Sequence, residues 1–337
     1  MDSPIDFRKM PTILPYKNII DKAFSKASKA VDTVSAQNRL LERRIKELKR
    51  VETATRVAEG YLNKILENTP YINMMPPYYV ELVSLIVDKG QFKKSMAAIK
   101  WACGMIKTLE IAYKKKIKGA QGKDLARIRG EFYGRMSSVL KQIRRDLVYL
   151  EDSRINLKNM PRFKQMKTVV IAGIPNVGKS SILKAITGAE PDIQSYPFTT
   201  KTVRVGYLEN SVQLVDTPGL LDRSFERRSK IEFHAIIALT YLADMILYVF
   251  DPSETCGYVM EEQMNLFEEL KKEFDIPFVV CFNKTDISDA GAYKKGLEKL
   301  GENVFLVSVL KNKGISELSC FFVKDIMPSK KKFYENA

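Results

Sequence analysis

The chain has 337 residues, of which 45% are hydrophobic and 28% charged, and its formal net charge is +15. This composition is that of a globular protein and excludes disordered, collagen-like and proline-rich chains. Four cysteines and a single histidine exclude a disulfide-stapled scaffold and a zinc site of the usual ligand spacing. The length predicts about two domains.

The positive charge is concentrated in the first half of the chain. Residues 1–165 contain 34 Lys and Arg against 17 Asp and Glu, whereas residues 166–337 contain 21 against 23. This asymmetry favours a polyanionic partner for the first half, either nucleic acid or an acidic membrane surface. A solvated Lys-rich helix surface would give the same pattern and is the simpler alternative.

Apolar residues at helical spacing dominate the first half. They predict helices over about residues 33–67, 80–88, 91–117 and 124–150, with a proline-rich break between the first two. Several helices with apolar stripes indicate a bundle, which we place at residues 1–160. We expect the single tryptophan, Trp101, to lie in its core.

The second half changes to short apolar runs rich in β-branched residues, mostly separated by helical patterns. The runs cover residues 168–174, 203–209, 212–217, 245–251, 278–283 and 304–309. Alternating strands and helices predict a mostly parallel six-stranded sheet with helices on both faces, within a domain at residues 161–327. The tight link at Asn210 and Ser211 predicts one antiparallel edge strand. Residues 328–337 would form a basic tail.

The segment from Gly173 to Ser180 matches the pattern G-x-x-x-x-G-K-[ST], after a predicted strand and before a predicted helix. Backbone N–H groups in such a loop wrap phosphates, and the helix N-terminus adds positive potential. Lys179 is predicted to reach the β- and γ-phosphates, and the Ser180 hydroxyl to bind Mg²⁺. The predicted phosphate-binding residues are Gly173, Pro175, Asn176, Val177, Gly178, Lys179, Ser180 and Ser181.

Two further motifs follow predicted strands. In Asp216-Thr217-Pro218-Gly219, Asp216 suits a carboxylate linked to Mg²⁺ through water, and the Gly219 N–H and Pro218 would lie at a γ-phosphate. Asn283-Lys284-Thr285-Asp286 matches N-K-x-D, in which the Asp carboxylate accepts the ring N–H and the exocyclic amine of guanine. After the last strand, Ser308, Val309 and Leu310 would flank the base. Four elements in this order at strand ends predict a P-loop GTPase domain that binds GTP and GDP.

These residues resemble the translation-factor class of GTPases, and Tyr196-Pro-Phe-Thr-Thr200 narrows the likeness to the Obg-related group. The segments 231–236 and 248–263, with Phe7-Arg8-Lys9-Met10-Pro11-Thr12, resemble the nucleolar GTP-binding protein (NOG) family, in a short form without the C-terminal extension of eukaryotic members. The resemblance covers nearly the whole chain. It implies that Phe198, Thr199 and Thr200 belong to the nucleotide site and that Thr200 is an Mg²⁺ ligand in the GTP state, although Thr199 is an alternative.

The residues expected to act in hydrolysis are Lys179, Thr200 and Gly219. Many small GTPases have a Gln after D-x-x-G that orients the attacking water, and Leu220 takes that position here. We therefore expect slow hydrolysis unless K⁺ or an activating partner completes the site. Asn176 is a candidate K⁺ ligand or simply a turn residue. For His234, on a predicted helix 18 residues beyond Asp216, we expect a structural or switch-coupled role and not that of a base.

The family resemblance implies a GTPase that assembles the large ribosomal subunit, with its helical domain on ribosomal RNA and ribosomal proteins as further partners. The Lys114-Lys115-Lys116-Lys118 and Arg43–Arg50 clusters are candidate phosphate contacts. A GTPase acting on a protein effector or an acidic membrane is the alternative. No signal peptide or membrane span is visible in the sequence. We expect a cytoplasmic monomer, or a nuclear or nucleolar one in a eukaryote.

Overall fold

The computed structural model describes residues 5–36, 38–196, 202–223, 230–299 and 301–326, and these divide into two compact units. The first unit comprises residues 6–71 and 86–158. The second comprises Ile5, residues 72–85 and residues 159–326. Among the helices described, none is long and apolar enough to cross a membrane. The basic tail expected at 328–337 lies outside the described residues.

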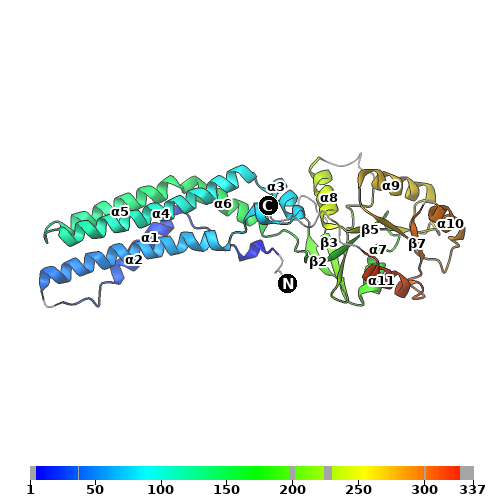
Figure 1. Ribbon diagram of the computed structural model, residues 1–337, viewed down its shortest axis with the longest axis horizontal. Helices are drawn as coiled ribbons and strands as arrows, with labels where there is room; N and C mark the ends of the chain where they lie inside the picture. Colours follow the sequence, from blue (N-terminus) through cyan, green and yellow to red (C-terminus); the bar gives the residue numbers. More distant parts are fainter. Residues whose placement is uncertain (1–4, 37, 197–201, 224–229, 300, 327–337) are drawn as a thin grey trace. The chain divides into compact units, whose positions relative to one another are not determined.

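The first unit is the helical bundle expected from the sequence (Figure 1). Its elements are the 3₁₀ helix η1 (Phe7–Lys9) and the helices α1 (Tyr16–Lys29), α2 (Arg39–Asn68), α4 (Lys89–Gly119), α5 (Leu125–Gln142) and α6 (Arg144–Leu157). Helix α2 packs on α1 and α4, and α4 also packs on α5 and α6. Leu62, Ile99, Ile106, Phe132 and Met136 are fully buried and form the centre of its core.

Three details of the bundle differ from the sequence expectation. Helix α2 begins at Arg39, because the Asn38 side chain accepts a hydrogen bond from the Leu40 N–H and caps the helix there. The single helix expected over 124–150 is interrupted at Ile143, whose backbone leaves helical geometry between α5 and α6. Trp101 is 43% exposed on α4 and does not lie in the core.

The second unit contains a seven-stranded sheet. The strands are β1 (Lys167–Ala172), β2 (Asp192–Ser195), β3 (Thr202–Leu208), β4 (Val212–Asp216), β5 (Met245–Phe250), β6 (Phe278–Phe282) and β7 (Asn303–Leu306), in the order β2-β3-β4-β1-β5-β6-β7. Its helices are α3 (Pro77–Ile86), α7 (Lys179–Thr187), α8 (Lys230–Leu242), α9 (Met260–Glu273), α10 (Gly291–Lys299) and α11 (Ile315–Lys324), with the 3₁₀ helix η2 (Ile72–Met74). The mostly parallel α/β fold is thus confirmed.

The edge of the sheet differs from the expectation of six strands with one antiparallel edge strand. Strand β3 pairs antiparallel with β4 on one side and with β2 on the other. The antiparallel strand is therefore an internal strand of the sheet and not its edge. The edge strand is β2, which has a short and mainly exposed sequence, Asp192–Ser195. A strand without a buried face gives no alternating apolar pattern, and this one was therefore missed.

Helix α3 packs with the second unit although it precedes the boundary predicted at residue 160. The Tyr79 hydroxyl accepts a hydrogen bond from the Phe163 N–H at 3.0 Å, and the Tyr78 ring meets the Phe163 ring edge-on at 5.1 Å. Tyr196, which directly precedes the undescribed residues 197–201, is also buried. The aromatic residues of α3 are therefore part of this unit's core.

Candidate functional site

The loop from Gly173 to Gly178 connects the buried strand β1 with α7. Gly173 and Gly178 have φ values of 136° and 101°, and Asn176 has 64°, so three of its residues adopt backbone conformations that L side chains disfavour. A Cβ on Gly173 would lie 2.5 Å from the Val249 carbonyl oxygen, and one on Gly178 would lie 2.2 Å from Asn283 Nδ2. Both glycines are thus required by local geometry, and the loop turns tightly around the start of α7.

Lys179, the first residue of α7, is 7% exposed. Its ammonium group donates to the carbonyl oxygens of Gly173 at 2.7 Å and Ile174 at 2.8 Å. Burial lowers the pKa of Lys179, and the Asp216 carboxylate opposes this effect. The loop therefore holds a largely desolvated amine, which an anion such as a phosphate would stabilise in its charged form.

Asp216 ends β4 and is fully buried beside Ser180. The Ser180 hydroxyl donates to Asp216 Oδ2 at 2.6 Å, whereas Asp216 Oδ1 is buried without a hydrogen-bond partner. Arg204 on β3 donates to the Ser180 hydroxyl, and its guanidinium lies 3.6 Å from Asp216 Oδ2. Burial raises the pKa of Asp216, against the Ser180 hydrogen bond and the Lys179 and Arg204 charges.

Gly219 and Leu220 follow Asp216 in the loop after β4. The Gly219 N–H, expected at a γ-phosphate, donates to Asp222 Oδ2 at 2.8 Å, and Pro218 beside it is half-buried. The Leu220 side chain is 1% exposed and so points into the core. Leu220 therefore contributes packing, and no polar side chain stands in for the missing Gln at that position.

The loop after β6 contacts both the loop from Gly173 to Gly178, called the phosphate loop below, and the loop after β7. Asn283 Nδ2 donates to the Val177 carbonyl oxygen at 2.9 Å, and its Oδ1 accepts from the Val309 N–H at 3.5 Å. The Asp286 carboxylate is solvent-exposed and accepts a hydrogen bond from the buried Ser308 hydroxyl at 2.6 Å. That hydrogen bond lowers the pKa of Asp286.

The chain matches two family models, the NOG1 N-terminal helical domain over residues 7–164 and nucleolar GTP-binding protein 1 over residues 230–286. An uncharacterised protein of Methanocaldococcus jannaschii is 44% identical over 84% of this chain and 81% of its own length. Nucleolar GTP-binding protein 1 of Drosophila melanogaster is 32% identical over 93% of this chain and 50% of its own. The chain belongs to the nucleolar GTP-binding protein 1 family.

Other members of this family match in the same way. The Saccharomyces cerevisiae protein is 32% identical over 84% of this chain and 45% of its own length. This chain thus spans about half the length of the curated relatives that bear the family name. Among solved structures, nucleolar GTP-binding protein 1 of Plasmodium falciparum aligns with 33% identity over 49% of this chain and 91% of that one, with a TM-score of 0.43.

The oxygen atoms at Ser180 and Asp216 fit the Mg²⁺ ion that this family of GTPases implies. A buried carboxylate oxygen without a partner and a hydroxyl at its side are hard ligands of the kind that Mg²⁺ prefers, directly or through water. No group of three or more His, Cys, Asp and Glu side chains gathers anywhere in the described ranges. Protein oxygens alone would therefore make an incomplete site, as expected where phosphates and water supply the remaining ligands.

Several predicted site residues lie apart from these contacts. Phe198, Thr199 and Thr200 are outside the described residues. Ser181 is exposed on α7, Pro175 is half-buried, and Leu310 is 82% exposed after β7. Asn176, the candidate K⁺ ligand, is exposed at the turn of the phosphate loop, and His234 is exposed on α8.

Sequence reasoning missed three polar residues that hold the site together. Arg204 reaches Asp216 through the cross-strand register of β3 and β4. Asp222 accepts a hydrogen bond from the Gly219 N–H, and Asp251 forms an ion pair with Lys284. The spacing of Gly219 and Asp222 could have indicated a local turn, whereas the other two pairs are formed between separate strands.

Only some of the basic side chains of the helical unit are left for a partner, because others are paired within the unit. Most of the predicted cluster at Arg43–Arg50 is engaged internally: Arg44 donates to the Ala120 carbonyl oxygen, Lys46 pairs with Glu42, and Arg50 pairs with Glu47. Lys114 likewise pairs with Glu110 at 2.7 Å. Helix α4, in contrast, has an exposed basic side, formed by Lys93, Lys94, Lys100, Lys107, Lys115 and Lys118 around Trp101 and Ile111, although Lys107 lies 3.6 Å from Glu59.

Proposed function

We propose that this chain binds and hydrolyses GTP with Mg²⁺ and serves as an assembly factor for the large ribosomal subunit, binding ribosomal RNA through its helical unit. The nucleotide part of the proposal is supported by family membership and by the convergence of four loops at the ends of β1, β4, β6 and β7. In parallel sheets, the carboxyl ends of the strands are where ligands bind.

Each loop would have one task in GTP binding. Lys179 and the N–H groups after Gly173 would neutralise the phosphates, and the free oxygen of Asp286 would accept the N–H groups of guanine. Ser180, Thr200 and Asp216 would hold Mg²⁺, the last through water, and the ion would supply positive charge to the β- and γ-phosphates. Contact of the Gly219 N–H with a γ-phosphate requires that it leave Asp222, so that bond is broken on GTP binding.

Hydrolysis would be slow in the isolated protein. Leu220 is buried and carries no hydrogen-bonding group, so it cannot orient a water. A K⁺ ion at Asn176, ribosomal RNA or a ribosomal protein would then have to complete the site. If nothing completes the site, the protein would be a GTP-binding scaffold that hardly hydrolyses GTP.

The exposed side of α4 is the observation that supports an RNA partner. Its Lys residues and Trp101 fall on one side of the helix at 3.6 residues per turn, and the only acidic residue of α4, Glu110, is paired with Lys114. Ammonium groups neutralise phosphates, and an exposed indole offers a stacking surface for an unpaired base. Trp101 is 43% exposed, so part of its indole ring is accessible to such a base.

The test is sedimentation with large ribosomal subunits, in K⁺ buffer at several salt concentrations, with a non-hydrolysable GTP analogue or GDP. We expect stronger binding with the analogue and a steep loss of binding with salt. The double variant Trp101→Ala/Lys100→Glu should abolish this binding. The control is the double variant Lys17→Glu/Lys29→Glu on α1, which changes the net charge of the protein by more than the first variant does. Binding to acidic liposomes in place of subunits would instead favour the membrane alternative.

A further inference from the structure

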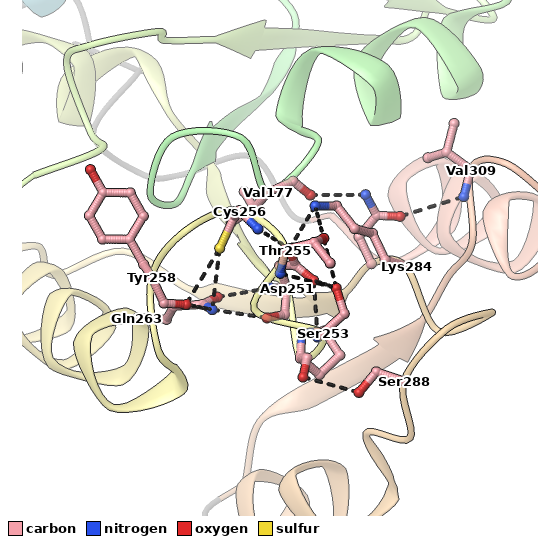
Figure 2. Close-up of polar contacts among 12 residues, drawn as sticks. Val177, Asp251, Ser253, Thr255, Cys256, Tyr258, Gln263, Lys284, Ser288 and Val309 are labelled. Carbon is pink, nitrogen blue, oxygen red and sulfur yellow. Dashed lines mark hydrogen bonds and ion pairs between the residues drawn. The ribbon is translucent and has the colours of Figure 1, made fainter.

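The loop that follows β5, residues 251–258, lies beside the base-reading loop Asn283–Asp286 and is held by a dense set of polar contacts (Figure 2). The Asp251 side chain is fully buried at the start of this loop. Its carboxylate accepts hydrogen bonds from the Ser253 N–H at 3.0 Å, the Cys256 N–H at 2.9 Å and the Thr255 hydroxyl at 3.2 Å. A buried carboxylate with this many donors is fixed in one orientation.

The Gln263 side chain of α9 fixes the same loop through its backbone. Its Oε1 accepts from the Asp251 N–H at 2.8 Å, and its Nε2 donates to the carbonyl oxygens of Asp251 at 2.9 Å and Tyr258 at 3.1 Å. Gln263 is itself fully buried. The loop is therefore rigid independently of its contact with the base-reading loop.

Lys284 connects the two loops. Its ammonium group donates to Asp251 Oδ2 at 2.6 Å and to the Thr255 hydroxyl at 2.9 Å. The backbone of Lys284 has φ = 58°, a left-handed conformation that an L residue with a long side chain seldom adopts. Such a conformation persists where surrounding contacts hold it, and the ion pair with a buried carboxylate is one of these contacts, beside the backbone hydrogen bonds of Thr285 and Ile287. Burial raises the pKa of Asp251, but the Lys284 and Ser253 contacts outweigh it and leave the pKa lowered.

Lys284 lies in the sequence between Asn283 and Asp286, two further residues of the proposed nucleotide site. Asn283 is attached to the phosphate loop at Val177, and Asp286 is attached to the loop after β7 at Ser308. The ion pair with Asp251 is a third attachment, from the β5 side. Without it, the segment between Asn283 and Asp286 would keep its backbone hydrogen bonds but lose the side-chain contact of its left-handed residue.

We propose that Asp251 is a positioning residue for guanine-nucleotide binding, which acts through Lys284 by holding the base-reading loop in the conformation that presents Asp286 to the base. The inference rests on nucleotide binding at this site but not on any role in ribosome assembly. Asp251 itself would not touch the nucleotide. Its contribution would appear as slow release of bound GDP.

The test is the dissociation rate of a fluorescent GDP from the full-length protein, measured by stopped flow with Asp251→Asn, Lys284→Ala and the double variant. We expect Asp251→Asn to accelerate release about tenfold, or about 1.4 kcal/mol. Because the residue acts through Lys284, the double variant should release GDP no faster than Lys284→Ala alone. Additive effects of the two substitutions would mean that Asp251 acts only on general stability and would overturn the inference.

A second pair of variants keeps the inference testable if Asp251→Asn does not fold. Thr255→Val removes a hydroxyl that contacts Lys284, whereas Ser288→Ala removes a hydroxyl just beyond the base-reading loop that donates to the Pro252 carbonyl oxygen and touches neither charge. We expect release about threefold faster for Thr255→Val and within about twofold of wild type for Ser288→Ala. Equal effects would overturn the inference. A wild-type protein that retains no GDP would overturn the proposed function as well, so the two failures are distinguishable.

Discussion

Substitution of Gly178 by Ala offers a quantitative test of the nucleotide site. The new Cβ would lie 2.2 Å from Asn283 Nδ2, and the backbone φ of 101° is strained for any L side chain. Asn283 cannot simply turn away, because it is buried and donates to the Val177 carbonyl oxygen. The strained backbone costs about 1–2 kcal/mol, and loss of a hydrogen bond about 1 kcal/mol. The free variant relieves these costs by relaxing the loop, and GDP binding must restore the loop at the same cost, which predicts a loss of GDP affinity of roughly 100-fold.

Fluorescent GDP titration of Gly178→Ala measures this loss, and Gly188→Ala is the matched control. Gly188 ends the same helix, α7, with a φ of 65°, but nothing lies within 4 Å of an added Cβ. The control should lose about 1–2 kcal/mol of stability and bind GDP as the wild type does. A GDP affinity of Gly178→Ala within about threefold of the control would refute the close approach of the phosphate loop to Asn283.

Three further predictions concern the metal site, the loop after β4 that contains Leu220, and the helical bundle. Asp216→Asn should reduce the Mg²⁺-dependent gain in GTP affinity roughly 10–100-fold, as measured by GTP titration with and without Mg²⁺, and an unchanged gain would remove Asp216 from the metal site. Leu220→Gln should destabilise the protein by about 1–3 kcal/mol without faster phosphate release in single-turnover assays, since the side chain points into the core; accelerated release would contradict this. The pKa of Glu151 is lowered from 4.5 chiefly by the Arg154 hydrogen bond, so its stabilising contribution is complete above that value and is lost as the pH falls through the lowered pKa. The urea midpoints of wild type and Glu151→Gln should therefore converge on acidification, and a gap that stays constant with pH would exclude this role.

The parts of the site that could be predicted from the sequence are those in which one short segment carries both the geometry and the chemistry. The segment from Gly173 to Ser180 combines left-handed glycines, a lysine and a helix start within eight consecutive residues, so its conformation follows from local rules. The same holds for the strand that precedes Asp216. Parallel strands then bring such segments to one edge of the sheet, which the alternation of strands and helices already predicts.

The remaining contacts depend on pairings that no local pattern encodes. Asp251 and Lys284 are 33 residues apart and meet because β5 and β6 are neighbours with a particular register. Arg204 meets Asp216 for the same reason across β3 and β4. Strand β2 was missed because its residues are mostly exposed, and the break at Ile143 was missed because the apolar stripe continues through it. Trp101 was assigned to the core because its sequence neighbours are apolar, although α4 turns it outward.

The position of α3 has a consequence for how the protein can be divided. The polypeptide passes between its two units at residues 5–6, 71–72, 85–86 and 158–159, so four backbone connections join them where a simple two-domain chain has one. A fragment that ends at residue 160 would retain α3 but lose its packing partners, and buried residues such as Tyr78, Leu82 and Val83 would face solvent. The helical unit is therefore not a detachable module, and recombination that exchanged it at a single junction would leave an apolar helix without its core.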